Sequence, residues 1–241
     1  MSFDRRPLEL SRWFLSAART RMFVYHRSRV PPDTPLLVVS NHRSFMDALV
    51  LMAAVGRPIR FACHHYMGQT PGLREIVTQL GCFPLADPQN RQPCFFEQGT
   101  QLLQQQQAVG LFPEGATPMV QPTSPTEVGK FHRGFAHLAL RSPVDNLAIL
   151  PVAIASLEEV TQSPIPVRML SLFDPSEPLF DREGWHPVVF YRRLAVGIGR
   201  PYWITPARRD AYRGKRAKAA VSEAIDCCHG EISTLLRQGF Y

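Results

Sequence analysis

Short apolar runs alternate with segments of helical periodicity along most of this chain. Continuous apolar runs of a few residues are typical of buried strands, whereas apolar residues spaced three and four apart predict amphipathic helices. The strands are expected at residues 35–40, 59–63, 82–85, 109–113, 147–154 and 188–198, and the helices at 45–55, 70–80, 95–108, 131–141 and about 207–237. This alternation predicts an α/β fold, with a central mostly parallel or mixed sheet flanked by helices and with N- and C-terminal helical additions.

Neither an internal repeat nor a Gly/Ser-rich linker divides the 241 residues, whose number suits one domain. We expect that domain at residues 30–241, preceded by a basic, amphipathic helical segment at 1–29. The longest apolar stretch, residues 147–157, is shorter than the roughly 20 residues of a membrane-spanning helix and contains a proline. The five cysteines show no CxxC spacing, which favours a reducing compartment. We therefore expect a cytoplasmic protein that does not span a membrane.

The chain has a formal net charge of +7, and the basic excess lies at its two ends. Residues 1–29 hold seven Arg against two acidic residues, and residues 200–218 hold seven Lys or Arg against one. Charge segregated in this way predicts a polyanionic partner. Nucleic acid is disfavoured, because zinc-finger spacing, a basic zipper and an RNP-like aromatic strand are all missing from the sequence. The expected partner is an anionic membrane surface.

An apolar stripe with an arginine border adds shape to the charge of the first segment. Arg12, Arg19 and Arg21 flank a stripe made of Leu10, Trp13, Phe14, Ala17, Ala18, Met22 and Tyr25. A helix of this kind can lie in the interface of an anionic membrane, so that the protein associates with the membrane peripherally. The alternative is that the stripe packs on the protein's own core, as it does in most amphipathic helices.

Candidate catalytic groups follow the first predicted strand. Asn41, His42, Arg43, Ser44 and Asp47 lie where a strand gives way to a helix, which is where α/β sheets place functional groups. If His42 precedes the helix, Asp47 can accept a hydrogen bond from one imidazole nitrogen and leave the other as a general base. The same residues also fit an ordinary helix start, with Ser44 as N-cap and Asp47 as its acidic partner in the first turn.

A second group of candidates follows the strand predicted at residues 109–113. Glu114 can accept hydrogen bonds from substrate hydroxyls, and Gly115 allows a ligand to approach the backbone closely. Two further segments stand out downstream, KFHRG at residues 130–134 and ILPVAI at residues 149–154. Metal binding is not expected, because neither the adjacent pair at 64–65 nor the cluster at 227–229 has zinc-ligand spacing.

Taken together and in this order, these segments resemble the PlsC-like glycerolipid acyltransferases, the family of 1-acyl-glycerol-3-phosphate acyltransferases. The family's NHxxxxD motif falls on Asn41, His42 and Asp47, and its FPEG motif on residues 112–115. Its KFxxG element falls on residues 130–134, and its IxPV element on 149–152. The resemblance covers roughly residues 30–200. Four ordered elements are far more specific than a bare HxxxxD.

The resemblance implies a glycerol-3-phosphate acyltransferase-like fold and an O-acyltransferase of phospholipid biosynthesis. A fatty acyl group would pass from acyl-CoA or acyl carrier protein to a hydroxyl of a lipid acceptor, without a cofactor. His42 would act as general base and Asp47 would orient it. The residues expected to bind substrate are Asn41, Arg43, Ser44, Glu114, Gly115, Lys130 and Arg91.

The chain departs from the family pattern at two positions. The second family motif usually ends in an Arg where this chain has Asp87, and FPEG usually continues as FPEGTR, whereas Thr117 stands at the Arg position here. Since paired Arg donors bind phosphate well, their loss predicts weak phosphate binding unless Arg43, Arg91, Lys130 or Arg133 compensates. The alternatives are a transferase for a non-phosphorylated lipid or alcohol acceptor and a non-catalytic lipid-binding relative.

Overall fold

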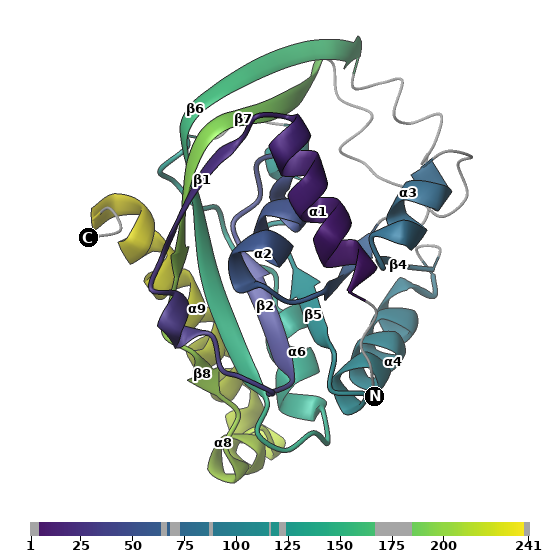
Figure 1. Cartoon of the computed structure of the whole chain (residues 1–241). Helices are drawn as coiled ribbons and strands as arrows, with labels where there is room; N and C mark the ends of the chain where they lie inside the picture. The colour runs from purple at the N-terminus through teal and green to yellow at the C-terminus, as the bar shows by residue number, and fades with distance from the viewer. Residues whose placement is uncertain are drawn as a thin grey trace.

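The computed structural model describes residues 5–63, 67, 73–86, 89–115, 117–120, 124–166 and 185–238. Within these ranges eight strands form one sheet in the order β1-β7-β6-β2-β5-β3-β4, with β8 paired to β6 (Figure 1). The strands are β1 (Arg21–Tyr25), β2 (Leu36–Ser40), β3 (Ile59–Cys63), β4 (Phe83–Pro84), β5 (Ala108–Leu111), β6 (Ala148–Pro166), β7 (Trp185–Ile198) and β8 (Tyr202–Trp203). The helices are α1 (Arg6–Ala17), α2 (Asp47–Val55), α3 (Leu73–Gln79), α4 (Arg91–Gln104), α5 (Thr117–Val120), α6 (Gly134–Arg141), α8 (Pro206–Ala211) and α9 (Ala217–Gln238), with 3₁₀ turns η1 (Arg27–Arg29) and η4 (Gly214–Arg216).

The sheet is mixed, as the sequence predicts. β6, β2, β5, β3 and β4 run parallel to their neighbours in that order, and β1 runs parallel to β7. β7 and β8 pair with β6 in the antiparallel sense. The parallel strands need crossover helices between them, which accounts for the alternation of strands and helices along the chain.

Helices cover both faces of the sheet, and β2 is therefore buried on both sides. Leu36 and Val38 point into a core formed with α1 and α2, whereas Leu37 and Val39 point into a core formed with α4, α6 and α9. In Figure 1, α1 and α2 lie on the near side of the sheet, and α6 and α9 on the far side. The continuous apolar pattern of residues 35–40 follows from this double burial.

The N-terminal segment is not helical throughout, which corrects the prediction for residues 1–29. α1 ends at Ala17, and Arg19 takes a left-handed backbone conformation (φ 54°) that turns the chain. Residues 21–25 then form β1, in parallel register with residues 193–197 of β7. Met22 and Tyr25, two members of the predicted stripe, therefore belong to a strand of the central sheet.

Several other element boundaries differ from those predicted. α4 spans Arg91–Gln104 instead of residues 95–108. The expected helix at 207–237 is broken between Ala211 and Ala217, where Gly214 has a positive φ of 60°. α2 begins at Asp47 rather than at residue 45, and His42 lies in the loop before the helix with either start.

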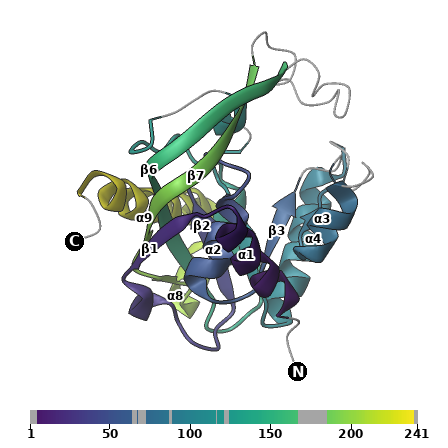
Figure 2. The same cartoon turned by 45° about the horizontal axis from the view of Figure 1, so that its top comes forward.

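β6 and β7 extend well beyond the sheet as a two-stranded arm. The prediction ended the first of these strands at residue 154, but β6 continues to Pro166 because residues from Ser156 onward pair with β7 alone. The register shifts near Glu158, and Figure 2 shows the arm projecting from the body of the protein. The arm brings Glu159 of β6 and Tyr191 of β7 to the loop that contains His42.

Candidate active site

The predicted catalytic groups meet at one edge of the sheet. His42 follows the carboxyl end of β2, and Glu114 follows the carboxyl end of β5. These two strands are parallel neighbours, with Val39 opposite Leu111. Since parallel strands end at the same edge, segments 72 residues apart in sequence are brought into contact there.

His42 and Asp47 form the pair that the sequence suggests. His42 Nδ1 lies 2.8 Å from Asp47 Oδ2. The carboxyl group is fully buried, whereas the imidazole is 16% exposed. A carboxylate at Nδ1 favours the tautomer with the proton on that nitrogen, so Nε2 is left with a lone pair. The pair can therefore accept a proton at Nε2.

Asp47 is surrounded by hydrogen-bond donors. Oδ2 accepts from the backbone N–H groups of Arg43 (2.7 Å) and Ser44 (2.8 Å) in addition to the imidazole. Oδ1 accepts from the hydroxyl of Tyr191 at 2.7 Å. Four donors to one carboxylate hold both of its oxygens in place, since each bond fixes the position of one oxygen.

Ser44 is not the N-cap of α2, because Met46 takes that position without a side-chain cap. The Ser44 hydroxyl donates instead to the carbonyl of Val189 (2.6 Å) and accepts from the Met46 N–H (3.1 Å). Asn41 is likewise buried, and its amide makes two bonds of 2.9 Å to the backbone of Ile154. Through these contacts, both residues join the loop before α2 to neighbouring strands.

Aromatic rings support the imidazole from one side. The rings of His42 and Phe112 are stacked with centroids 4.1 Å apart, and the ring of Phe61 stacks next at 5.4 Å from Phe112. The stack therefore fixes the plane of the imidazole.

Glu114 links three loops and is itself buried. Its Oε1 accepts from the backbone N–H of His42 (2.9 Å), and its Oε2 accepts from the N–H of Gly129. A Cβ at residue 129 would lie 2.7 Å from that carboxylate, which explains the glycine there. Gly115 closes a turn with φ of 68°, and its N–H donates to Phe112. Glu114 thus supports the loop that contains His42, and each of its carboxylate oxygens accepts a hydrogen bond from a backbone N–H.

Arg43 is bound to a carboxylate that sequence reasoning did not identify. Its guanidinium contacts both oxygens of Glu159, with Nε 2.9 Å from Oε2. Their hydrogen bonds raise the pKa of Arg43 and lower the pKa of Glu159, so both groups stay charged. The planar fork that would bind a phosphate is occupied by a carboxylate in this structure.

The remaining predicted substrate residues lie on other segments of the chain. Arg91 is the first residue of α4 and half-buried, and Lys130 is exposed in the loop after Gly129. Thr117 is exposed at the start of α5, while Asp87 lies outside the described residues. Among the residues that the structure describes, no three His, Cys, Asp or Glu side chains are grouped as a metal site requires.

Tyr191 and Glu159 are the site residues that sequence reasoning missed. Tyr191 is 1% exposed, and burial together with the charge of Asp47 raises its pKa well above the ordinary value. A tyrosine inside a predicted buried strand signals a hydroxyl that needs a partner. The sequence does not reveal that partner, because Asp47 lies 144 residues away.

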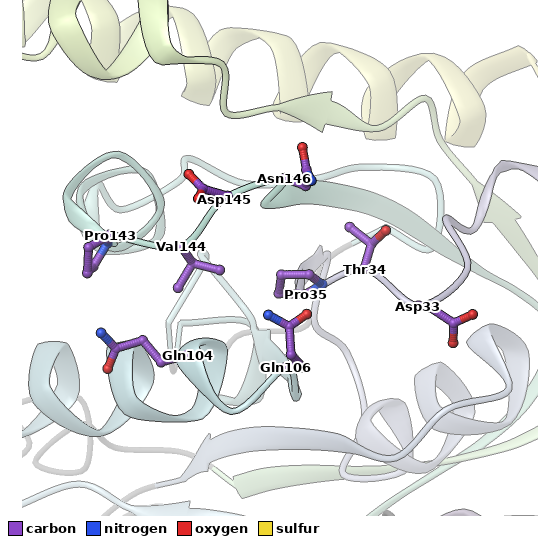
Figure 3. Close-up of a pocket in the computed structure, with 9 residues that line it drawn as sticks. All are labelled: Asp33, Thr34, Pro35, Gln104, Gln106, Pro143, Val144, Asp145 and Asn146. Atoms are coloured by element: carbon purple, nitrogen blue, oxygen red, sulfur yellow. The ribbon is translucent and has the colours of Figure 1, made fainter. Parts of the chain in front are cut away.

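A cavity of about 360 Å³ lies at the opposite edge of the sheet (Figure 3). Its lining includes Pro35, Gln106 and Asn146, which lie one or two residues before the amino ends of β2, β5 and β6. The candidate catalytic groups lie at the carboxyl ends of β2 and β5. This cavity is therefore separated from His42 by the length of the strands.

Comparisons with known proteins point to one family. A family model described as Acyltransferase matches residues 21–155. A chloroplast 1-acyl-sn-glycerol-3-phosphate acyltransferase of Arabidopsis thaliana is 27% identical over 51% of this chain and 32% of its own length. A Mycoplasma genitalium protein named "Probable 1-acyl-sn-glycerol-3-phosphate acyltransferase" is 30% identical over 52% of this chain and 46% of its own. The chain thus matches less than half the length of either relative.

A solved structure shares the fold. The crystal structure of the 1-acyl-sn-glycerophosphate acyltransferase PlsC from Thermotoga maritima superposes with a TM-score of 0.57. The match covers 94% of this chain and 78% of the other at 16% identity, and it confirms the predicted α/β architecture. The family model spans more than half of the chain, including His42, Asp47 and Glu114. This chain belongs to the acyltransferase family.

Proposed function

We propose that the protein transfers a fatty acyl group from a thioester to the hydroxyl of a glycerolipid acceptor. The donor is acyl-CoA or acyl carrier protein, and the acceptor is 1-acyl-glycerol-3-phosphate. The observation that supports this most directly is the 2.8 Å contact between His42 Nδ1 and Asp47 Oδ2, which leaves Nε2 as a base on a chain of the acyltransferase family.

In the proposed mechanism, His42 Nε2 takes the proton of the acceptor hydroxyl as its oxygen attacks the thioester carbonyl. The new ester C–O bond forms and the C–S bond breaks, after which the proton passes from the imidazolium to the leaving thiolate. Asp47 stabilises the transient imidazolium by its charge. No bond to the protein forms, and the reaction as written consumes no cofactor.

A non-phosphorylated acceptor is the second candidate, and the Arg43–Glu159 pair favours it. Arg43 is the cation nearest to His42 in sequence, and its fork already holds a carboxylate. A site that recognises a neutral headgroup has no need of a free guanidinium, whereas phosphate recognition usually uses one. The two candidates differ only in the acceptor, so one assay distinguishes them.

The assay measures acyl transfer by the purified protein from acyl-CoA and from acyl carrier protein, with lysophosphatidic acid and neutral lipid alcohols as acceptors. We expect turnover with lysophosphatidic acid. Turnover confined to neutral acceptors would establish the second candidate, and Glu159→Gln should then increase use of the phosphorylated acceptor by releasing Arg43. Lipid binding without turnover on any acceptor would contradict both and identify a non-catalytic relative.

We further propose that α1 docks the protein peripherally on an anionic membrane. Leu8, Ser11 and Leu15 are buried against the core, so one face of the helix follows the alternative of internal packing. The neighbouring face leaves Trp13 68% exposed and Leu10 37% exposed, beside Arg6 and Arg12. Exposed aromatic and basic side chains on one helix favour binding at a lipid interface. Among the described helices, none is both long and apolar enough to cross a bilayer.

The C-terminal basic segment does not support the same contact. α8 and α9 contribute Ala211 and Ala220 to the core on the face of the sheet opposite α1. Arg208 and Arg209 are bound within the protein, by Glu223 and by the carbonyl of Val144. A single membrane surface that meets α1 therefore does not meet residues 200–218 in the same orientation.

Replacing Leu10 and Trp13 by Ser should weaken the affinity for anionic liposomes, measured by sedimentation, about tenfold. In the docked protein the lipid would bury these two exposed side chains, and a loss of about 1.4 kcal/mol of that burial already amounts to tenfold. Added salt should weaken binding of the unaltered protein, since screening reduces the arginine contribution. Point changes are preferable to truncation, because deleting residues 1–29 would also remove β1 from the sheet. Trp203→Ser, which alters another exposed tryptophan on β8, is the matched control. Equal binding by the Leu10/Trp13 variant and the unaltered protein would contradict docking through α1.

A further inference from the structure

The second oxygen of Asp47 has its own dedicated donor. Oδ2 is occupied by the imidazole and by two backbone N–H groups, all from residues within five positions of Asp47. Oδ1 receives the hydroxyl of Tyr191 at 2.7 Å, from a strand that lies far away in sequence. The local loop therefore binds one carboxylate oxygen, and β7 binds the other.

Tyr191 is held in place along its backbone as well as by its hydroxyl. Its N–H lies 3.5 Å from the sulfur of Met46, and its carbonyl accepts from the hydroxyl of Thr20 at 3.0 Å. Two residues earlier, the carbonyl of Val189 accepts from Ser44. The ring is thus fixed between the loop before α2 and the chain that follows α1, which gives the hydroxyl little freedom to leave Asp47.

We propose that Tyr191 is a positioning residue of the acyl-transfer site, whose hydroxyl orients the Asp47 carboxylate and moderates its charge toward His42. This inference rests on the proposed function. A donor on Oδ1 draws electron density away from the carboxylate, so Oδ2 attracts the imidazole proton less strongly. The same bond fixes the carboxylate plane, and hence the direction of the bond to Nδ1. Tyr191 touches neither substrate nor the reacting atoms in this role.

The hydroxyl can act as a donor at every pH at which the imidazole changes charge. Burial raises the pKa of Tyr191 well above its ordinary value, so the group stays protonated. Other charged or titratable groups also surround the pair, and they must be constant in any comparison. They are Glu114 after β5, Arg43 in the loop, Glu159 on β6, and His132, which lies beside Gly115.

Tyr191→Phe removes the hydroxyl and retains the ring in the core. We expect kcat to fall about tenfold, because a hydrogen bond to a charged group contributes on the order of one decade or more. The KM values for donor and acceptor should change less than about twofold, since the bond lies away from the substrates. Without the hydroxyl on Oδ1, more negative charge remains on Oδ2 of Asp47, which should then hold the imidazole proton more strongly. The acid limb of the kcat profile should therefore move to higher pH.

Tyr202→Phe is the matched control. Tyr202 is also a buried tyrosine that donates to a carboxylate, at 3.0 Å from Glu223 Oε1, but it lies on β8 in the other core. Loss of the Tyr202 hydroxyl should lower the melting temperature, as loss of the Tyr191 hydroxyl should. It should leave the pH profile of kcat unchanged. A purely structural role for Tyr191 would make the two variants behave alike, and that result would overturn the proposal.

An NMR titration of the His42 imidazole separates this inference from the proposed function. The signal is assigned by its loss in His42→Asn and followed against pH in the unaltered protein and in Tyr191→Phe. An upward move of the midpoint supports the positioning role, even if acyl transfer is not detected in either protein. An unchanged midpoint overturns it, even if acyl transfer is observed.

Discussion

Replacing His42 by Ala should lower kcat for acyl transfer about 100- to 10,000-fold, the range that general-base catalysis contributes. His42 Nε2 is the base of the proposed mechanism, and Nδ1 is already occupied by Asp47 at 2.8 Å. An alanine leaves no group to take the hydroxyl proton. The measurement is the steady-state rate of ester formation at saturating donor and acceptor, beside the unaltered protein.

The folded state needs its own control in this experiment. The His42 ring stacks on Phe112, so its removal also leaves a gap beside Phe112 and takes one hydrogen-bond donor from Asp47. His42→Asn retains a polar donor toward Asp47 and should be as inactive as the alanine variant while melting closer to the unaltered protein. His137→Ala, on α6 and bound to Tyr212, should retain activity. Activity of His42→Ala within tenfold of the unaltered protein would rule out the general-base role.

The change Asp47→Asn should lower kcat about 100- to 1000-fold, which is typical for the loss of one electrostatic contact in a transition state. The amide can still accept through one oxygen from His42 Nδ1 and the two backbone N–H groups, so the loop should retain its shape. The negative charge that stabilises the imidazolium is lost. The acid limb of the pH profile should therefore move downward, opposite to the change expected for Tyr191→Phe.

The double variant His42→Ala/Asp47→Asn tests whether the two residues act as one unit. Since Asp47 acts through the imidazole, removing its charge should cost little once His42 is absent. The double variant is therefore expected to be about as active as His42→Ala alone. Additive losses would mean that Asp47 contributes to the reaction by a route that does not pass through His42.

Local pattern was sufficient for most of the fold. Residues 59–63 form β3 as predicted, with Ile59 and Phe61 buried on either side of the partly exposed Arg60. The N-terminal segment was predicted wrongly beyond Ala17, since residues 21–25 keep an apolar pattern that suits a helix or a strand. Pairing with β7, about 170 residues away, decided between the two. Propensity is a weak guide where a distant strand supplies the hydrogen bonds.

For the candidate site, too, the local sequence predicted some contacts and distant strands decided the others. Its motifs predicted that His42 and Asp47 act together, because both lie within one strand-to-helix turn where few conformations are open to the chain. Other contacts could not be predicted from sequence, since each needs a partner from another part of the sheet. They are the contacts of Asn41, Ser44, Arg43 and Glu114. The motif letters identify the residues but do not say which of them face the substrate.

By itself, the sequence determined the alternation of strands and helices and the family motifs, and it predicted the contact between His42 and Asp47, because these depend on side-chain periodicity and on contacts within a few residues. Only the tertiary structure decided that Glu159 binds the guanidinium of Arg43, that Glu114 supports the loop that contains His42 and that Tyr191 binds the second oxygen of Asp47. Those contacts join segments 72 to 144 residues apart. The packing of the whole sheet brings these segments together, and no local sequence pattern encodes that packing.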